Sequence, residues 1–330
     1  MKKAIAAALC LCLTFCLGAC SGKDEGLTEV SLCEVTHSVF YAPLYAALEL
    51  GYFEEEGLDI TLTNGGGADK VMTAVLADQA DIGLAGPEAC IYVLNEGREN
   101  YPVIFSQLTK RDGSFLVGRE DVDFSWDMLK GSTIIGGRKG GVPEMTLEYV
   151  LRQNGLEPGQ NITVDTSVQF DMMAGAFTGG NGDYVTLFEP TATEVELAGK
   201  GYILTSIGTE SGEIPYTAFF ASKNYIKENP ETIQSFTNAI AKGLEWIAES
   251  DSAKVAQVLS PQFPDTDLDI LAKVIERHIE IDAWNNELIM KEDSLERLET
   301  VMEQAGELDE RADYDILVDN SFAEKALAGK

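Results

Sequence analysis

Short apolar runs alternate with amphipathic helical patterns along the first two thirds of the chain. Residues 30–35 form an apolar run, a polar loop follows, and a helix is expected from Pro43 to the glycine at position 51. Residues 58–63 then alternate strictly between apolar and polar side chains, as in a strand with one buried face. This order of strand, loop and helix repeats, which predicts an α/β fold with mostly parallel sheets flanked by helices.

The same order of elements restarts after residue 121, so we predict two α/β units. The further expected strands are 81–85, 103–108, 114–119, 133–136, 162–165, 184–188, 203–207 and 217–222. Beyond them, apolar side chains recur at helical spacing in residues 232–249, 252–259, 266–284 and 294–305. The C-terminal third is therefore predicted to be helical.

The N-terminus has the pattern of a lipoprotein signal peptide, expected to span residues 1–19. Lys2 and Lys3 precede an apolar stretch that is too short to span a membrane but suits a signal-peptide core. The sequence Leu-Gly-Ala-Cys then ends at Cys20 and resembles a bacterial processing site, after which the cysteine carries lipid. Residues 20–27 would be a lipid-anchored tether on the outer face of the cytoplasmic membrane, at the cell surface or in the periplasm. A short anchor helix is the alternative.

Charge and composition exclude several classes of protein. The chain has 55 acidic and 24 basic residues, a formal charge of -31, and loss of the signal peptide would leave 22 basic residues. A nucleic-acid partner is excluded because phosphates would be repelled. Two histidines argue against a His-rich metal site, and we expect neither metal nor cofactor. Beyond Cys20 only Cys33 and Cys90 remain, which argues against a disulfide scaffold and leaves their pairing open.

Several motifs closely resemble those of the SsuA/THI5-like solute-binding proteins, the NMT1/THI5 or nitrate/sulfonate/taurine family. The matching segments are THSVFYAPLYAA (36–47), GYFEEEGLDI (51–60), QADIG (79–83), Asp183, FEP (188–190), NYI (224–226) and NPE (229–231). Their order and spacing agree with the family over nearly all of the mature chain.

The resemblance implies a two-lobed, type II periplasmic-binding-protein-like fold and a monomeric lipoprotein that serves an ABC transporter permease. Lobe 1 would comprise residues 28–117 and 218–330, and lobe 2 residues 118–217. The extended segments 112–118 and 216–222 would form the hinge. Closure of the lobes over a small molecule is the family mechanism, and a ligand drives it only through contacts that are better in the closed state.

Candidate ligand-binding residues follow from their position, because ligands of such sheets lie beyond the carboxyl ends of strands. They are Thr36, His37, Phe40, Tyr41, Gly66, Gly86, Glu88, Gly137, Arg138, Gly140, Tyr184, Glu189 and Tyr216. His37 resembles the histidine of members that bind the pyrimidine precursor of thiamine, although a capping or core role is equally open. Glu88 and Glu144 stand in first helical turns, where capping and binding are both open. Glu189 is favoured as a ligand residue because the family's lobe 2 pocket is built there.

The balance of charge in the expected cleft directs the choice of ligand. Four acids, Glu88, Glu144, Asp183 and Glu189, stand against Arg138 and Lys139. This favours an aromatic heterocycle with amino groups, such as a thiamine pyrimidine precursor, over a small bare anion. An alkanesulfonate or taurine, or a cationic amine, is the alternative ligand.

Two other classes of function remain beside this hypothesis. A pyrimidine-synthesising enzyme resembling THI5 is disfavoured because its cofactor-linked lysine and cysteine-rich motif are not recognisable, and no nucleophile with the spacing of a triad stands out. An adhesive or structural lipoprotein would require neither cleft nor hinge. We therefore predict a binding protein that is not an enzyme.

Overall fold

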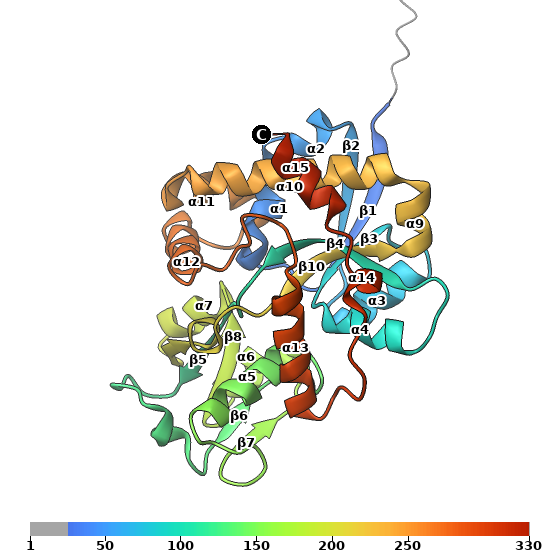
Figure 1. Ribbon diagram of the computed structural model, residues 1–330. Coiled ribbons are helices and arrows are strands. Elements are labelled where there is room, and N and C mark those ends of the chain that lie inside the picture. Colours follow the sequence, from blue (N-terminus) through green and yellow to red (C-terminus); the bar gives the residue numbers. More distant parts are fainter. Residues whose placement is uncertain (1–25, 330) are drawn as a thin grey trace, which may run out of the picture.

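Two lobes, each built on a five-stranded sheet, make up the protein (Figure 1). The computed structural model describes residues 26–329. The predicted signal peptide, the lipidation site Cys20 and most of the 20–27 tether lie outside the described residues. Within the described part of the chain, no helix combines the length and apolar character needed to cross a membrane.

The sheet of lobe 1 has the strand order β2-β1-β3-β10-β4. Its strands are β1 (Thr28–Glu34), β2 (Leu58–Asn64), β3 (Ile82–Ala85), β4 (Pro102–Thr109) and β10 (Thr217–Ser222). β1 pairs in parallel with β2 and β3, whereas β10 runs antiparallel to β3 and β4. The sheet is therefore mostly parallel, as predicted: β1, β2, β3 and β4 run in one direction, and β10, which returns from lobe 2, runs in the other.

Lobe 2 repeats this arrangement with the strand order β7-β6-β8-β5-β9. Its strands are β5 (Ser114–Gly118), β6 (Thr133–Ile135), β7 (Thr163–Asp165), β8 (Tyr184–Phe188) and β9 (Tyr202–Ser206). β6 is parallel to β7 and β8, and β5 is antiparallel to β8 and β9. Because β5 belongs to this sheet, the expected boundary between residues 117 and 118 falls inside a strand, and the chain crosses between lobes at 110–113 and 212–216.

Helices cover both faces of each sheet, and the C-terminal region is helical as predicted (Figure 1). In lobe 1 they are α1 (Ala42–Glu49), α2 (Tyr52–Glu55), α3 (Ala68–Leu76), α4 (Glu88–Asn95), α9 (Lys223–Glu228), α10 (Pro230–Ala248), α11 (Ser252–Leu259), α12 (Leu268–Glu280), α14 (Tyr314–Leu317) and α15 (Ser321–Ala328). In lobe 2 they are α5 (Val142–Gln153), α6 (Met173–Thr178), α7 (Thr191–Leu197) and α8 (Ile207–Ser211). Single 3-10 turns are η1 (Val39–Tyr41), η2 (Trp126–Leu129), η3 (Phe170–Met172) and η4 (Ser260–Gln262).

The core of lobe 1 requires a close approach between α1 and α10. α10 has a strongly amphipathic sequence and buries one face, including Phe236, against the sheet. A Cβ atom built on Gly243 of this helix would lie 2.3 Å from the carbonyl oxygen of Pro43 in α1. Only glycine allows the two backbones to pack this closely, so Gly243 sets the distance between the helices.

The C-terminal segment is not confined to lobe 1. After α12 it follows β4, with Asn285 donating its backbone N–H to Leu108 (2.8 Å) and the N–H of Gln107 pointing at the carbonyl of Leu288 (2.8 Å). Helix α13 (Glu292–Ala305) then lies along α5 of lobe 2 (Figure 1). The segment thus connects the two lobes beside the crossings near residues 110–113 and 212–216.

Candidate functional site

A cavity of about 230 Å³ lies between the lobes and is lined by residues of both. Eight of the residues expected from the sequence line it: Thr36, Tyr41, Gly66, Gly86, Glu88, Gly137, Arg138 and Tyr216. They follow the carboxyl ends of β1, β2, β3 and β6 or, for Tyr216, precede β10. Most of the candidates therefore lie together, at the edge of the sheets where ligand sites are expected.

Three helices begin at the cavity wall. The first residues of α3, α4 and α5, which include Ala68, Glu88 and Val142, line the cavity. No side chain at the preceding Gly67, Pro87 or Gly141 caps these helices. The partial positive charge of a helix N-terminus favours an anionic or hydrogen-bond-accepting group, so this wall suits the acceptor end of a ligand.

Glu88, the first residue of α4, places a carboxylate in this wall. The residue is only 2% exposed, and its Oε2 has no hydrogen-bond partner among the described residues. Burial raises the pKa of the Glu88 carboxyl from 4.5 to about 7, against the opposing effects of the Arg138 charge and of the backbone N–H groups of Glu88, Val142 and Ala89. Near neutral pH this side chain therefore exists in both protonation states in the empty cavity.

The charged residues of the cavity are balanced in sign. Asp69 and Glu88 are the acids that line it, and Lys70 and Arg138 are the bases. Lys70 and Arg138 are both exposed, and Nζ of Lys70 donates to the carbonyl of Gly66 at 3.3 Å. The excess of acidic groups expected from the sequence is not present at the cavity.

The three other acids expected at the cleft are engaged elsewhere. Oε2 of Glu144 accepts the N–H of Gly140 at 3.1 Å, and Oδ2 of Asp183 accepts the N–H of Thr133 at 2.8 Å. Glu189, the favoured candidate, is 1% exposed and does not line the cavity. The base Lys139 likewise pairs with a residue outside it, Glu307, at 3.2 Å.

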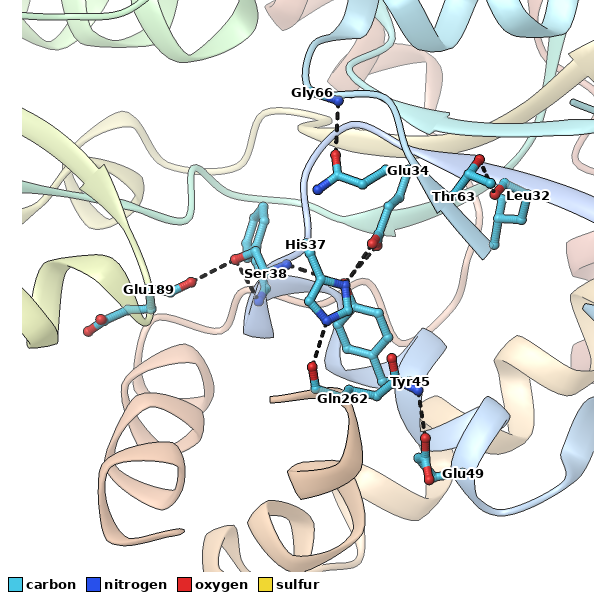
Figure 2. Close-up of polar contacts among 12 residues, drawn as sticks. Leu32, Glu34, His37, Ser38, Tyr45, Glu49, Thr63, Gly66, Glu189 and Gln262 are labelled. Atoms are coloured by element: carbon cyan, nitrogen blue, oxygen red, sulfur yellow. Dashed lines mark hydrogen bonds and ion pairs between the residues drawn. The ribbon is translucent and has the colours of Figure 1, made fainter. Parts of the chain in front are cut away.

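Glu189 connects the lobes instead of facing the cavity. Its Oε1 accepts from Nη1 of Arg277 (2.7 Å) and from the hydroxyl of Thr193 (2.8 Å), while Oε2 accepts the Thr193 N–H (2.9 Å). Figure 2 shows its carbonyl accepting from the Ser38 hydroxyl at 2.8 Å. With both oxygens occupied by protein donors, this carboxylate has a structural position, contrary to our expectation of a ligand contact.

Aromatic rings form the apolar part of the wall. Tyr41, Phe170, Phe188 and Tyr216 line the cavity, with ring centroids 5.5 Å apart for Phe170 and Phe188 and 6.1 Å for Phe188 and Tyr216. Burial raises the pKa of the Tyr41 and Tyr216 hydroxyls well above the usual range, so both stay protonated. Such a wall suits a flat, partly apolar ligand.

His37 lies behind the cavity wall and does not line it. Its Nδ1 is 2.7 Å from Oε1 of Glu34, and its Nε2 is 2.9 Å from the carbonyl oxygen of Gln262 (Figure 2). Both neighbours are acceptors, so both ring nitrogens donate, and the Glu34 carboxylate raises the pKa of the imidazole. The ring also stacks on Phe263 at 4.8 Å. The structure therefore favours the structural alternative for His37.

Three further candidates lie outside the cavity lining. Tyr184 begins β8 and packs near Gly118, at the amino end of the strand, while the cavity lies at the carboxyl end. Gly140 turns away and accepts the hydroxyl of Tyr92 at 3.0 Å through its carbonyl. Phe40 is 1% exposed and supports the wall from behind, 5.8 Å from the ring of Phe188.

The loop that follows β7 also reaches the cavity, although its residues are not among those expected from the sequence. Gln169 lines the cavity from the loop just before η3, Phe170 from η3, Met173 from α6 and Thr186 from β8. The position of residues 166–169 after a strand was an available signal, because the same rule selected the loops after β6 and β8. Thr186 carried no such signal, since it lies within a strand.

The remaining questions from the sequence concern sulfur and metals. Cys33 and Cys90 are both buried free thiols, and burial raises the pKa of each. Across residues 26–329, no group of three or more His, Cys, Asp or Glu side chains is arranged to hold a metal ion.

Two mixed sheets joined by crossing segments, with a cavity between the lobes, define the fold of periplasmic binding proteins. The chain belongs to the NMT1/THI5-like family, whose model matches residues 39–253. It is 43% identical over 319 residues to the Bacillus subtilis (strain 168) protein named "Putative binding protein YtlA", covering 96% of this chain and 95% of that one. The family resemblance and the two-lobed fold expected from the sequence are confirmed.

Solved structures show the same architecture at low identity. The alkanesulfonate-binding protein SsuA of Xanthomonas axonopodis pv. citri, bound to MOPS, superposes with a TM-score of 0.71 at 16% identity, covering 89% of this chain and 98% of that one. The periplasmic nitrate-binding protein NrtA of Synechocystis PCC 6803 gives a TM-score of 0.71 at 17% identity, with 92% and 89% covered. These identities establish the shared fold.

Proposed function

We propose that this protein captures a small solute between its lobes and delivers it to the permease of an ABC importer. The observation that carries the proposal is the cavity itself, because both lobes contribute to its wall and three helices begin there. The relationship to a protein named as a binding protein, at 43% identity, supports a binding role over an enzymatic one.

The proposal includes the cellular setting indicated by the sequence. Residues 1–19 act as a signal peptide, and Cys20 carries the lipid that holds a monomeric protein to the outer face of the cytoplasmic membrane. The tether 20–27 allows the folded part to reach its permease. Labelling of Cys20 with a radioactive fatty acid, compared with Cys20→Ser, tests this part independently of any ligand.

For the solute we propose a small flat heterocycle with an amino group, of the thiamine-pyrimidine-precursor type. The aromatic wall fits a ring, and the cavity offers Glu88 as an acceptor and Arg138 with the helix N-termini as donors. An alkanesulfonate or taurine is the second candidate, favoured by the same Arg138 and helix N-termini. The balanced charge of the cavity gives no separate support to a simple cationic amine.

A thermal-shift and calorimetry panel tests the function and separates these ligands. It includes 4-aminopyrimidine, ethanesulfonate, taurine and a primary alkylamine, and we expect the aminopyrimidine to raise the melting temperature most. A free ligand at about 100 times its Kd stabilises the native state by about 2.7 kcal/mol, which is readily seen. No shift with any probe, together with no small molecule released from the denatured protein in mass spectrometry, would refute solute binding.

A matched pair of variants shows whether binding occurs in this cavity. Gln169 is an exposed side chain that lines it, whereas Gln160 is exposed on a loop elsewhere in lobe 2. We expect Gln169→Trp to obstruct the cavity and weaken binding at least tenfold, and Gln160→Trp to bind as the wild type does. Equal affinity of both variants would place the site elsewhere.

A further inference from the structure

The Glu88 carboxylate is incompletely satisfied: the backbone N–H groups of Glu88, Ala89 and Val142 act on it and lower its pKa, but its Oε2 has no hydrogen-bond partner among the described residues. Its side chain folds back over the start of α4: a Cβ atom added to Gly86 would lie 2.0 Å from Oε2 of Glu88. That oxygen is buried in the cavity wall without a hydrogen bond to any described residue. A buried carboxylate oxygen without a donor is costly, so a ligand that supplies an N–H gains the most here.

Arg138 offers the complementary group from the other lobe. It lies on the loop between β6 and α5, lines the same cavity and is exposed. Its positive charge lowers the pKa of the Glu88 carboxyl, which lines the same cavity. Within the described residues, the Arg138 guanidinium makes no ion pair or side-chain hydrogen bond of its own, so its donors are available.

We propose that Glu88 and Arg138 hold the two polar ends of one ligand across the gap between the lobes. Glu88 accepts from an amino group on the ring, and Arg138 donates to a ring nitrogen or another acceptor of the same molecule. The ligand class is therefore an amino-substituted nitrogen heterocycle, with Tyr41 and Phe188 against its faces. This inference rests on the proposed solute-binding function and assigns specificity within it.

Holding the ligand from both lobes explains how it favours the closed state. Glu88 belongs to α4 of lobe 1 and Arg138 to lobe 2, so one ligand satisfies both groups only when the lobes are together. A ligand shifts a conformational equilibrium only by its difference in affinity for the two states. Several titratable groups interact electrostatically with Glu88. Arg138 lowers the pKa of the Glu88 carboxyl, and Glu88 in turn raises the pKa values of Tyr41, Cys90, Tyr92 and Tyr216.

The test compares two probes of the same shape, 4-aminopyrimidine and 4-methylpyrimidine. Only the first has the N–H donor, and both keep the ring acceptors. We expect the wild-type protein to bind the amino compound at least tenfold more tightly in calorimetry at pH 8. Glu88→Gln should reduce that preference to threefold or less, whereas Arg138→Gln should weaken both probes by a similar factor.

Glu144→Gln is the matched control. Glu144 is also a 2% exposed carboxylate in a first helical turn, but it lies outside the cavity lining, and we expect its variant to keep the wild-type preference. A melting temperature measured for every variant establishes that each one is folded. If Glu88→Gln does not fold, Glu88→Met provides the same comparison without the acceptor.

The outcomes separate this inference from the proposed function. Wild-type binding of both probes with equal affinity, or an unchanged preference in Glu88→Gln, overturns the role of Glu88 while solute binding stands. Loss of the preference in Glu144→Gln as well would also contradict the role of Glu88. If neither ring probe binds but ethanesulfonate or taurine does, both this inference and the heterocycle proposal fail, and the transport role stands.

Discussion

The guanidinium of Arg277 on α12 donates through Nη1 to Oε1 of Glu189 at 2.7 Å and so joins the two lobes. Nη2 of the same arginine donates to Glu196 of α7 at 3.2 Å. These interactions lie at the end of β8, where the sequence favoured a ligand contact. The carboxylate is buried and paired, while Arg277 is 18% exposed, so this ion pair differs in kind from the exposed pairs of the surface.

Arg277→Gln is expected to lower the free energy of unfolding by about 3 kcal/mol, because it leaves the buried Glu189 carboxylate without its charged partner. Urea unfolding followed by circular dichroism measures the change. Lys273→Gln is the control: Lys273 also pairs with Glu196, at 3.5 Å, but is 50% exposed, so its loss should cost less than about 1 kcal/mol. Equal effects of the two substitutions would show that the Arg277–Glu189 pair does not stabilise the fold.

Glu189→Gln should destabilise the protein by about 1–3 kcal/mol and leave intrinsic ligand affinity within about threefold of the wild type. The reason is that both carboxylate oxygens bind Thr193 and Arg277, and neither faces the cavity. Calorimetry well below the melting temperature, combined with urea unfolding, separates the two effects. A tenfold loss of affinity in a fully folded variant would return Glu189 to the binding site.

Glu88→Gln is expected to stabilise the empty protein at pH 8. The folded state holds the proton up to about pH 7, whereas an ordinary carboxyl releases it near 4.5. The unfolded chain therefore binds fewer protons in this window, and the stability of the wild type falls as the pH rises from about 4.5 to about 7. Above pH 7 the full cost, on the order of 1–3 kcal/mol, is present and glutamine removes it.

Melting temperatures of the wild type and Glu88→Gln at pH 4.5 and pH 8 measure this difference. The stabilising effect of the variant should be larger at pH 8 than at pH 4.5. Glu144 must be tested beside it, since burial also raises the pKa of its carboxyl to about 7. If the difference in melting temperature between Glu88→Gln and the wild type were the same at both pH values, the burial cost assigned to Glu88 would be wrong.

The affinity for a neutral amino-heterocycle should rise with pH between 6.5 and 8. Glu88 accepts the ligand N–H best as a carboxylate, and its pKa of about 7 places its deprotonation in this window. Burial raises the pKa values of Tyr41, Tyr216 and Cys90, so these groups stay protonated in this window. Calorimetric titrations at three pH values should show a slope that Glu88→Gln removes. An unchanged slope in that variant would assign the titration to another group.

Gly243→Ala is expected to destabilise the protein by about 1–3 kcal/mol, since the added methyl group meets the Pro43 carbonyl of α1. Gly175→Ala in α6 is the control, because nothing lies within 4 Å of its added Cβ atom and its backbone is helical. The control should be neutral or more stable by up to about 1 kcal/mol. Similar urea midpoints for the two variants would mean that the helices separate at little cost.

The sequence predicted the order of strands and helices well because apolar periodicity reports burial locally. Residues 58–63, for example, alternate strictly and form β2, and the helix expected at 252–259 is α11. It also indicated which loops gather at the cavity, since the carboxyl ends of strands meet along one edge of a sheet. Thr36, Glu88 and Arg138 were found in this way, although Thr36 and Arg138 are 102 positions apart in the sequence and belong to different lobes.

The direction of β10 and the lobe to which β5 belongs could not be derived from local pattern. Both depend on which strand supplies the hydrogen-bond partner, and a strand that crosses between lobes has the same apolar pattern in either sheet. The same limit applies to Tyr184, whose residue type suits a pocket but which stands at the amino end of its strand.

The family, the α/β architecture and the edge of each sheet where ligands can lie therefore follow from local sequence pattern and motifs. Which acidic side chains face the cavity depends instead on contacts between segments that are distant in the sequence. Arg277 lies 88 residues from Glu189 yet holds its carboxylate away from the cavity, while Oε2 of Glu88 has no hydrogen-bond partner among the described residues. Whether a buried carboxylate is free to bind a ligand depends on partners that only folding brings within hydrogen-bond distance, and those partners have no local signature in the chain.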